Sequence, residues 1–121
     1  MQTAIIMIQI IVALGIFNVW LLRYGKETHW RGGTAKNMKE EFATYGLSVW
    51  FMVVIGFLKV SLATLLIIGV WIPMLTKPSA TILAVLMLGA VSMHVKVKDS
   101  VKKALPALTM FLLSAIVALL S

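Results

Sequence analysis

Long apolar stretches make up most of the chain, at residues 3–22, 49–75, 78–95 and 104–120. Each is close to the length of about 20 residues that an α-helix needs to cross a bilayer. None shows the strict alternation of a barrel strand, and an open sheet would leave backbone groups unpaired in lipid. The pattern predicts an all-α integral membrane protein, a four-helix bundle that forms one transmembrane domain over residues 1–121.

Residues at the ends of these stretches refine the helix boundaries. Ser48 is suited to cap the start of the second helix, and Pro73 marks its far end. Pro78 is favoured in the first turn of the third helix. Pro106 is tolerated in the opening turn of the fourth helix but kinks that helix if it starts back at Asp99. The first stretch lacks the flanks of a cleaved signal peptide, so we expect a retained helix.

The polar connection 23–47 predicts a short amphipathic helix between the first and second spans. Asn37 and Glu40 have the spacing of a capping box, and Gly46 is suited to end the helix. Three apolar residues share one face: Met38, Phe42 and Tyr45. We expect this helix to lie at the membrane interface and fold back under the bundle. A solvated helix that merely links two spans is the alternative.

Composition supports a membrane location. Apolar residues make up 61% of the chain and the mean hydropathy is +1.02, both above what soluble domains show. The net charge of +7 comes from basic residues between apolar stretches, where anionic lipid headgroups are nearer partners than nucleic acid.

Basic residues are distributed unequally between the two sides of the predicted bundle. Lys77 is alone on one side, and nine lie on the other: Arg23, Lys26, Arg31, Lys36, Lys39, Lys96, Lys98, Lys102 and Lys103. The positive-inside rule places those nine in the cytoplasm and both chain ends outside. Four of them are expected to contact lipid headgroups: Lys96, Lys98, Lys102 and Lys103.

Four tryptophans lie near the ends of the predicted spans. Trp20, Trp30 and Trp50 fall at the inner boundary and Trp71 at the outer one. Tryptophan is enriched where hydrocarbon meets headgroups, so we interpret all four as interfacial anchors.

Several kinds of chemistry are excluded. The chain has no cysteine, which excludes disulfides and thiolate sites. His29 lies in the polar connection and His94 in a span, so they do not form a facing pair of haem ligands. The chain contains no pair of Glu-x-x-His motifs, so the sequence does not indicate a metal centre. We therefore expect no catalytic residue, no metal site and no enzyme activity of the chain alone.

A charged residue at membrane depth is the strongest candidate for function. Lys59 lies about ten residues into its span, near the bilayer midplane. Asn18 and His94 come from two other spans at similar depth, and Glu40 and Glu41 are candidate ion-pair partners below them. This arrangement predicts a polar pocket open to the cytoplasmic side. The alternative is structural, with these groups bonded between helices or to helix ends.

Small residues flank this site. Gly56 and Ala63 lie on the face of Lys59, and Ala90 lies one turn before His94. They permit either a close approach of helices or a flat ligand beside the lysine.

Two sets of residues resemble the DoxX-like family of small bacterial membrane proteins. The second span matches at Gly56–Lys59, Leu65–Gly69 and Ile72–Pro73. The later part matches at Met87–Ala90, His94, Lys96, Asp99 and Pro106–Ala107. The resemblance is strongest over 46–113 and implies a four-helix protein of the bacterial inner membrane. Its members act in quinone-linked electron transfer, oxidative-stress complexes and receptor assembly.

Combined with this resemblance, the site predicts an accessory subunit of a membrane oxidoreductase system, linked to quinone. A lysine or histidine donates to a quinone carbonyl, and the ring lies among Met52, Ile55, Gly56 and Met87. Bound lipid is the other candidate ligand. The alternatives are an assembly or scaffold protein with a membrane partner, and solute or proton transport by a homo-oligomer.

Overall fold

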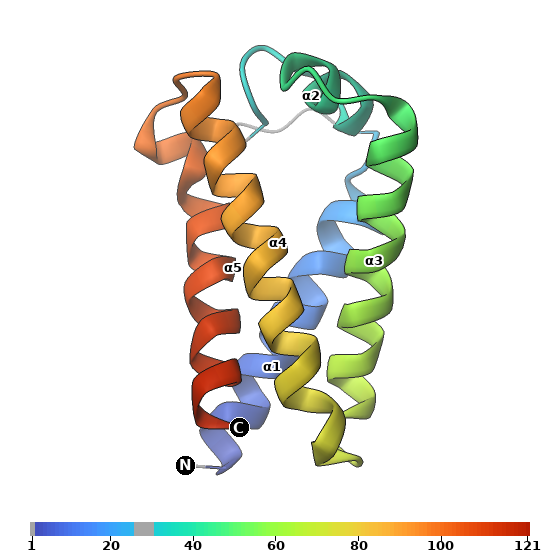
Figure 1. The fold of residues 1–121 in the computed structure, drawn as a ribbon, viewed down its shortest axis with the longest axis vertical. Coiled ribbons are helices and arrows are strands. Elements are labelled where there is room, and N and C mark those ends of the chain that lie inside the picture. The colour runs from blue at the N-terminus through green and yellow to red at the C-terminus, as the bar shows by residue number, and fades with distance from the viewer. Residues whose placement is uncertain (1, 26–30) are drawn as a thin grey trace.

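The computed structural model describes residues 2–25 and 31–121, and every regular element within them is helical. Four long helices stand side by side, with a short helix across one end (Figure 1). The elements are α1 (Gln2–Phe17), the π-helical turn η1 (Asn18–Leu22), α2 (Met38–Thr44), α3 (Val49–Ile68), the 3-10 turn η2 (Pro73–Leu75), α4 (Thr76–Lys96) and α5 (Val101–Leu120). Four segments are long and apolar enough to span a membrane: Gln2–Leu22, Val49–Ile68, Pro73–Lys96 and Val101–Leu120. The predicted all-α membrane bundle is confirmed.

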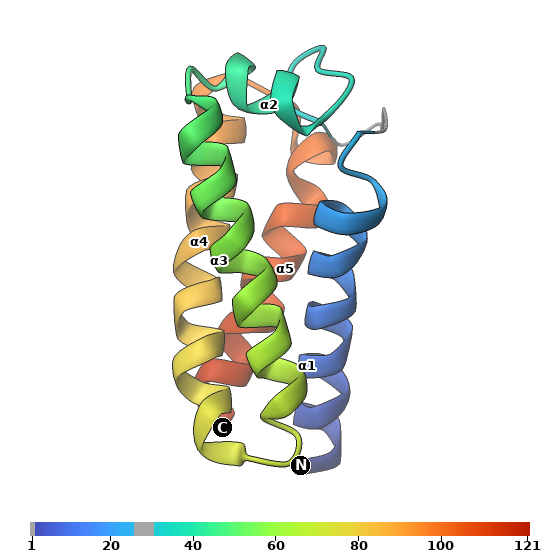
Figure 2. The same ribbon diagram turned by 90° about the vertical axis from the view of Figure 1, so that its right-hand side faces the viewer.

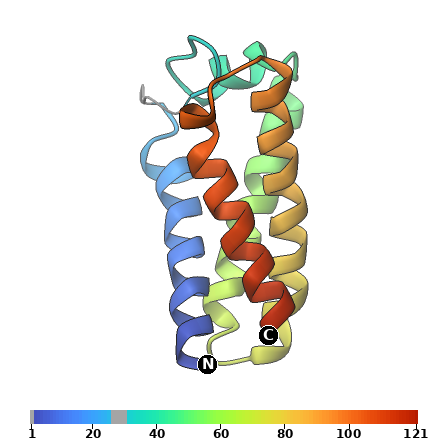
Figure 3. The ribbon, with the colours of Figure 1, turned by 90° about the vertical axis from the view of Figure 1, so that its left-hand side faces the viewer.

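The four spans form a ring. α1 contacts α3 and α5, and α4 contacts the same two helices. Spans joined by short connections run antiparallel as neighbours, which Figures 2 and 3 show from two sides. We name residues 31–47, which include α2 and cover one end, the cap. The opposite end, where α1 begins and α5 ends, is the distal end.

The apolar surface is divided between a narrow core and a broad outward face. Trp50, Phe57 and Leu119 are each more than 70% exposed, as expected for residues that face lipid. The largest buried side chains of the core come from all four spans: Ile16, Leu66, Leu83, Val12 and Val117.

The cap forms as its polar and apolar positions predict. The Asn37 side chain accepts from the Glu40 backbone N–H at 2.8 Å and donates to the Glu40 carboxylate at 2.9 Å. Gly46 ends the segment with φ +79°, a left-handed conformation that favours glycine. The three apolar residues of the predicted face are all buried: Met38, Phe42 and Tyr45. This face attaches the cap to the bundle.

Two helix ends differ from the expected positions. α3 begins after Ser48, whose hydroxyl accepts from the Phe51 N–H at 3.1 Å, but it ends at Ile68. The chain then turns before Pro73, because the residue preceding a proline is disfavoured in the helical region. α5 begins at Val101, so Pro106 lies in its second turn and removes one backbone hydrogen bond.

Candidate functional site

Lys59 lies at the middle of α3 and is buried, with 7% of its surface exposed. Its ammonium nitrogen is 5.7 Å from the centroid of the Trp20 indole, within the range of a cation–π interaction. In the part of the chain that the structure describes, no hydrogen bond or ion pair to this nitrogen is present. Among the described residues, the cation therefore has an aromatic neighbour but no oxygen acceptor.

Gly56 lies one turn before Lys59 and provides the space that Trp20 occupies. A Cβ atom at position 56 would lie 2.6 Å from the indole Cζ3. The indole therefore fills the space beside the lysine where the sequence left room for a flat ligand. Trp20 itself is buried in η1, so its predicted role as an interfacial anchor is wrong. Trp30 lies outside the described residues.

The other residues predicted for this site are only partly brought together. Met52, Gly56 and Lys59 lie on the buried face of α3. The Met52 sulfur accepts from the Tyr24 hydroxyl at 3.4 Å. Met87 is buried on α4.

Asn18 and His94 make their polar contacts elsewhere. The half-buried Asn18 accepts from the Arg23 Nε at 3.3 Å, within its own end of the span. No hydrogen bond or ion pair joins Asn18 or His94 to Lys59 among residues 2–25 and 31–121. Lys59, Asn18 and His94, which were predicted to share one pocket, thus contact different partners.

His94 belongs to a buried cluster that binds α4 to the cap. Its Nδ1 lies 2.8 Å from Asp99 Oδ2, and its Nε2 lies 3.5 Å from the Tyr45 hydroxyl. Asp99 also accepts from the Gly33 N–H at 3.0 Å. We name Tyr45, His94 and Asp99 the His94 cluster. The pairing of Asp99 with His94 was not predicted, because a spacing of five residues across a helix end gives no periodic signal.

The two adjacent glutamates of α2 have different surroundings. Glu40 is exposed and completes the N-terminal cap of α2. Glu41 is half-buried and accepts from the Gly32 N–H at 3.1 Å, with Arg31 Nη1 at 3.8 Å. Burial raises the pKa of Glu41, and the Gly32 hydrogen bond and the electrostatic interactions with Arg31, His94 and Lys59 oppose this rise. Of the two candidate ion-pair partners, Glu41 is the one electrostatically coupled to Lys59.

Tyr45 shares this environment. Burial raises the pKa of Tyr45, and the carboxylates of Glu41 and Asp99 raise it further. Its hydroxyl therefore stays protonated and can donate a hydrogen bond at any pH that cells reach.

The four lysines predicted to contact lipid headgroups divide into two pairs. Lys96 donates to the Tyr45 carbonyl at 2.8 Å, and Lys103 donates to the Gly33 carbonyl. These two fasten the cap to α4 and α5. Lys98 and Lys102 are exposed. Lys26, counted with the same basic side, lies outside the described residues.

A set of polar contacts at the distal end, separate from those at the cap, was not predicted. Buried Gln9 donates from Nε2 to the Leu66 carbonyl at 2.6 Å and to the Thr76 hydroxyl oxygen at 3.3 Å. The Thr76 hydroxyl donates to the Gly69 carbonyl at 3.3 Å. This distal lock, formed by Gln9, Thr76 and the backbone carbonyls of Leu66 at the end of α3 and Gly69 after it, contains no charge.

No group of three or more His, Cys, Asp or Glu side chains is placed to hold a metal ion in the described ranges. His29 lies outside them. The site chemistry that the structure describes consists of a sheltered ammonium and a cluster of titratable groups at the cap.

Comparison with known proteins agrees with the architecture. The model of the DoxX-like family matches residues 29–117, from the polar connection to the last turns of α5. No curated protein sequence and no solved structure matches the chain. The match covers most of the sequence and includes the cap, α3 and α4, so the chain belongs to the DoxX-like family.

Proposed function

We propose that this protein is an accessory subunit of a quinone-linked oxidoreductase system in the bacterial inner membrane. Its part is to bind the quinone headgroup at Lys59. The single observation that supports this role is the buried Lys59 ammonium, which has the Trp20 indole beside it and no oxygen acceptor among the described residues. The chain itself is not the catalyst in this proposal.

The energetics of the lysine favour an external acceptor. A cation at membrane depth costs free energy unless protein groups or a ligand replace its water. A cation–π contact contributes about 0.5–2 kcal/mol, less than a hydrogen bond to a charged group restores in a dry site. A ligand carbonyl would therefore relieve the cost at Lys59. Because the Trp20 indole fills the space beside Lys59, a quinone ring would have to displace it to reach the ammonium, and Met52 is buried on the same face of α3.

Quinones supply two-electron, two-proton redox chemistry when bound. The residues of this chain would orient the headgroup and hold a proton near it. Glu41 is suited to that second task, because burial raises its pKa and its charge is coupled to that of Lys59.

We further propose that the cap faces the cytoplasm and that both chain ends face outward. The excess of basic residues on the cap side supports this orientation by the positive-inside rule. Lys98 and Lys102 are exposed there and available to anionic headgroups.

Quinone carried through purification tests this function. Wild-type protein extracted in mild detergent from quinone-containing membranes should retain quinone in a stoichiometric amount, measured by solvent extraction and mass spectrometry. Lys59→Met should lose that quinone while its unfolding temperature stays equal or rises, because methionine fills the space without a buried charge. Lys36→Met, at an exposed cap position, is the matched control and should keep the quinone. Equal quinone in the wild type and Lys59→Met would refute the proposal.

An assembly or scaffold role is the second candidate, and the polar cap favours it. His94, Asp99 and Glu41 find partners within the chain and stabilise the attachment of the cap, and Lys98 and Lys102 are exposed beside it. In that case Lys98→Glu with Lys102→Glu should release a partner subunit in pull-down experiments, and Lys59→Met should not. Quinone should then be absent from every sample.

A further inference from the structure

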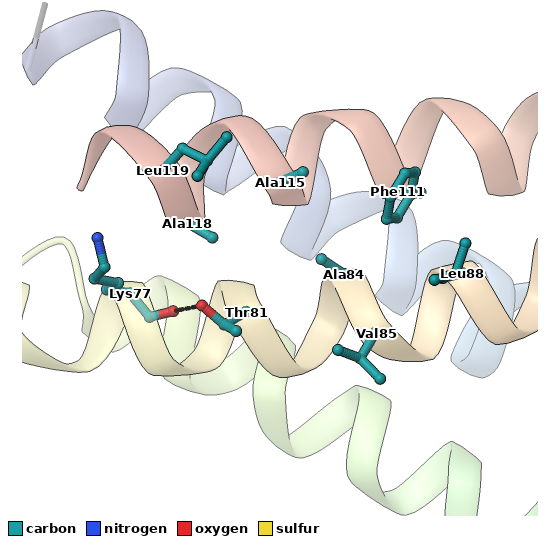
Figure 4. A pocket seen from close by; sticks show the side chains of 9 residues that line it. All are labelled: Lys77, Thr81, Ala84, Val85, Leu88, Phe111, Ala115, Ala118 and Leu119. Carbon is teal, nitrogen blue, oxygen red and sulfur yellow. Dashed lines mark hydrogen bonds between the residues drawn. The ribbon is translucent and has the colours of Figure 1, made fainter.

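A groove runs along the outer side of the bundle between α4 and α5, away from the Lys59 site. Its volume is about 350 Å³. Lys77 stands at one end, and the walls and floor are otherwise nearly all apolar (Figure 4). The lining residues are Lys77, Thr81, Ala84, Val85, Leu88, Phe111, Ala115, Ala118 and Leu119. The groove is open because three of its lining residues are alanines, and larger side chains at these positions would fill the space between the helices.

The groove has the length of one membrane leaflet. Lys77 and Leu88 are separated by 11 residues of α4, a rise of about 16 Å at about 1.5 Å per residue. Half of a hydrocarbon core is about 15 Å. A groove that begins at Lys77 therefore extends from the headgroup level of the distal leaflet to about the midplane.

The polar end of the groove is a cation with unused donors. Lys77 is exposed, and its Nζ donates to the Ser121 carbonyl at 3.5 Å, which is at the limit of a hydrogen bond. An ammonium has three donors, so at least two are left for a ligand. The Thr81 hydroxyl donates to the Lys77 carbonyl at 2.7 Å, which uses its only proton. The chemistry that fits is a phosphate held by Lys77.

We propose that this groove binds one acyl chain of an anionic phospholipid from the distal leaflet, with its phosphate paired to Lys77. The groove has a cation at headgroup level and an apolar lining below it, and such a lipid has its charged phosphate and its acyl chain in the same order. A helix from a second copy, about 10 Å across, is too wide to enter a groove of this volume. The lipid site is independent of the function proposed for Lys59.

Retention of lipid in native mass spectrometry tests the site, with phosphatidylglycerol and phosphatidylcholine as probes at equal concentration. Wild-type protein should hold one phosphatidylglycerol in preference to phosphatidylcholine. Lys77→Gln should remove that preference, and Ala115→Leu should reduce retention of both lipids several-fold because it fills the groove. Lys36→Gln and Ala4→Leu, at exposed positions outside the groove, are the matched controls and should behave as wild type.

The outcomes separate the possible occupants. Wild-type retention and preference in both groove variants would overturn the proposal. A dimer that Ala115→Leu dissociates, with lipid retention unchanged, would also overturn it and assign the groove to a second copy. If Ala115→Leu does not fold, the preference measured with Lys77→Gln decides, because an exposed lysine is not needed for folding.

Discussion

The two ends of the bundle are held together by different chemistry. At the cap, the His94 cluster joins ionisable groups: an imidazole, a carboxylate and a phenol within 3.5 Å contacts. At the distal lock, the neutral amide of Gln9 bonds to a hydroxyl and to backbone carbonyls. Neutral groups pay no cost of ionisation in a dry site, whereas charged groups need every partner in place. The cap should therefore respond more than the distal lock to loss of a partner, and the raised pKa of its buried Glu41 adds a dependence on pH.

Removal of the histidine from the cap should have the largest effect. His94→Leu leaves the Asp99 carboxylate buried without its imidazole and should lower the free energy of unfolding by about 3–5 kcal/mol. Denaturant titration in detergent micelles measures this loss. Val95→Leu, at the exposed neighbouring position, should change the free energy little. A loss at His94 no greater than the loss at Gln9 would remove the difference between the two ends.

Breaking the neutral distal lock should lower the free energy of unfolding by less than breaking the His94 cluster. Gln9→Leu leaves the Leu66 carbonyl and the Thr76 hydroxyl oxygen without their amide donor, and should cost about 1–3 kcal/mol in the same titration. Met7→Leu, on the exposed face of α1, is the matched control. The loss at Gln9 should be the same at pH 5 and pH 8, because no ionisable group takes part. A pH-dependent loss would contradict the neutral lock.

Glycines test the packing between the two ends. Gly56→Ala places a Cβ 2.6 Å from the Trp20 ring and should cost about 1–3 kcal/mol through displacement of the indole. Gly89→Ala meets nothing within 4 Å and should stabilise its helix by up to about 1 kcal/mol. Unfolding temperatures in one detergent measure both. The opposite signs are the prediction, and a stabilising Gly56→Ala would show that Trp20 does not lie there.

The smallest effect should be a slope of stability with pH at the cap. Because burial raises the pKa of Glu41 above its usual 4.5, the folded state favours the protonated carboxyl. The contribution of this group is complete below pH 4.5 and is lost as pH rises through the raised value. Glu41→Gln should flatten this decline in unfolding temperature, and Glu40→Gln, exposed on the same helix, should not. An identical slope in Glu41→Gln and wild type would contradict the buried position of the carboxyl.

Local signals in the sequence predicted much of the fold. Apolar length predicted the four spans, and the capping residues Asn37, Glu40 and Ser48 predicted two helix starts. The end of α3 was missed because Val70, Trp71 and Ile72 continue the apolar run, and composition does not distinguish a turn from a helix there.

The candidate site was harder to predict, because its contacts join residues far apart in the chain. Gln9 bonds to a backbone carbonyl 57 residues away, and any helix offers the same acceptor. Trp20 was assigned to the interface because tryptophan is frequent there, yet Gly56 admits its ring to the core. The burial of Lys59 was expected from the free-energy cost of a charge in lipid. Its contact with Trp20 was not, because that contact depends on which face η1 turns toward α3.

Fluorescence of Trp20 tests the central claim most directly, because its indole lies beside the Lys59 ammonium. A chain with the other three tryptophans changed to phenylalanine keeps this ring as its one tryptophan reporter. Titration with a short-chain quinone in detergent should quench the fluorescence in a saturable way, and Lys59→Met should abolish the saturable part. Quenching that rises without saturation, or that is the same in Lys59→Met, would contradict a quinone site at this lysine.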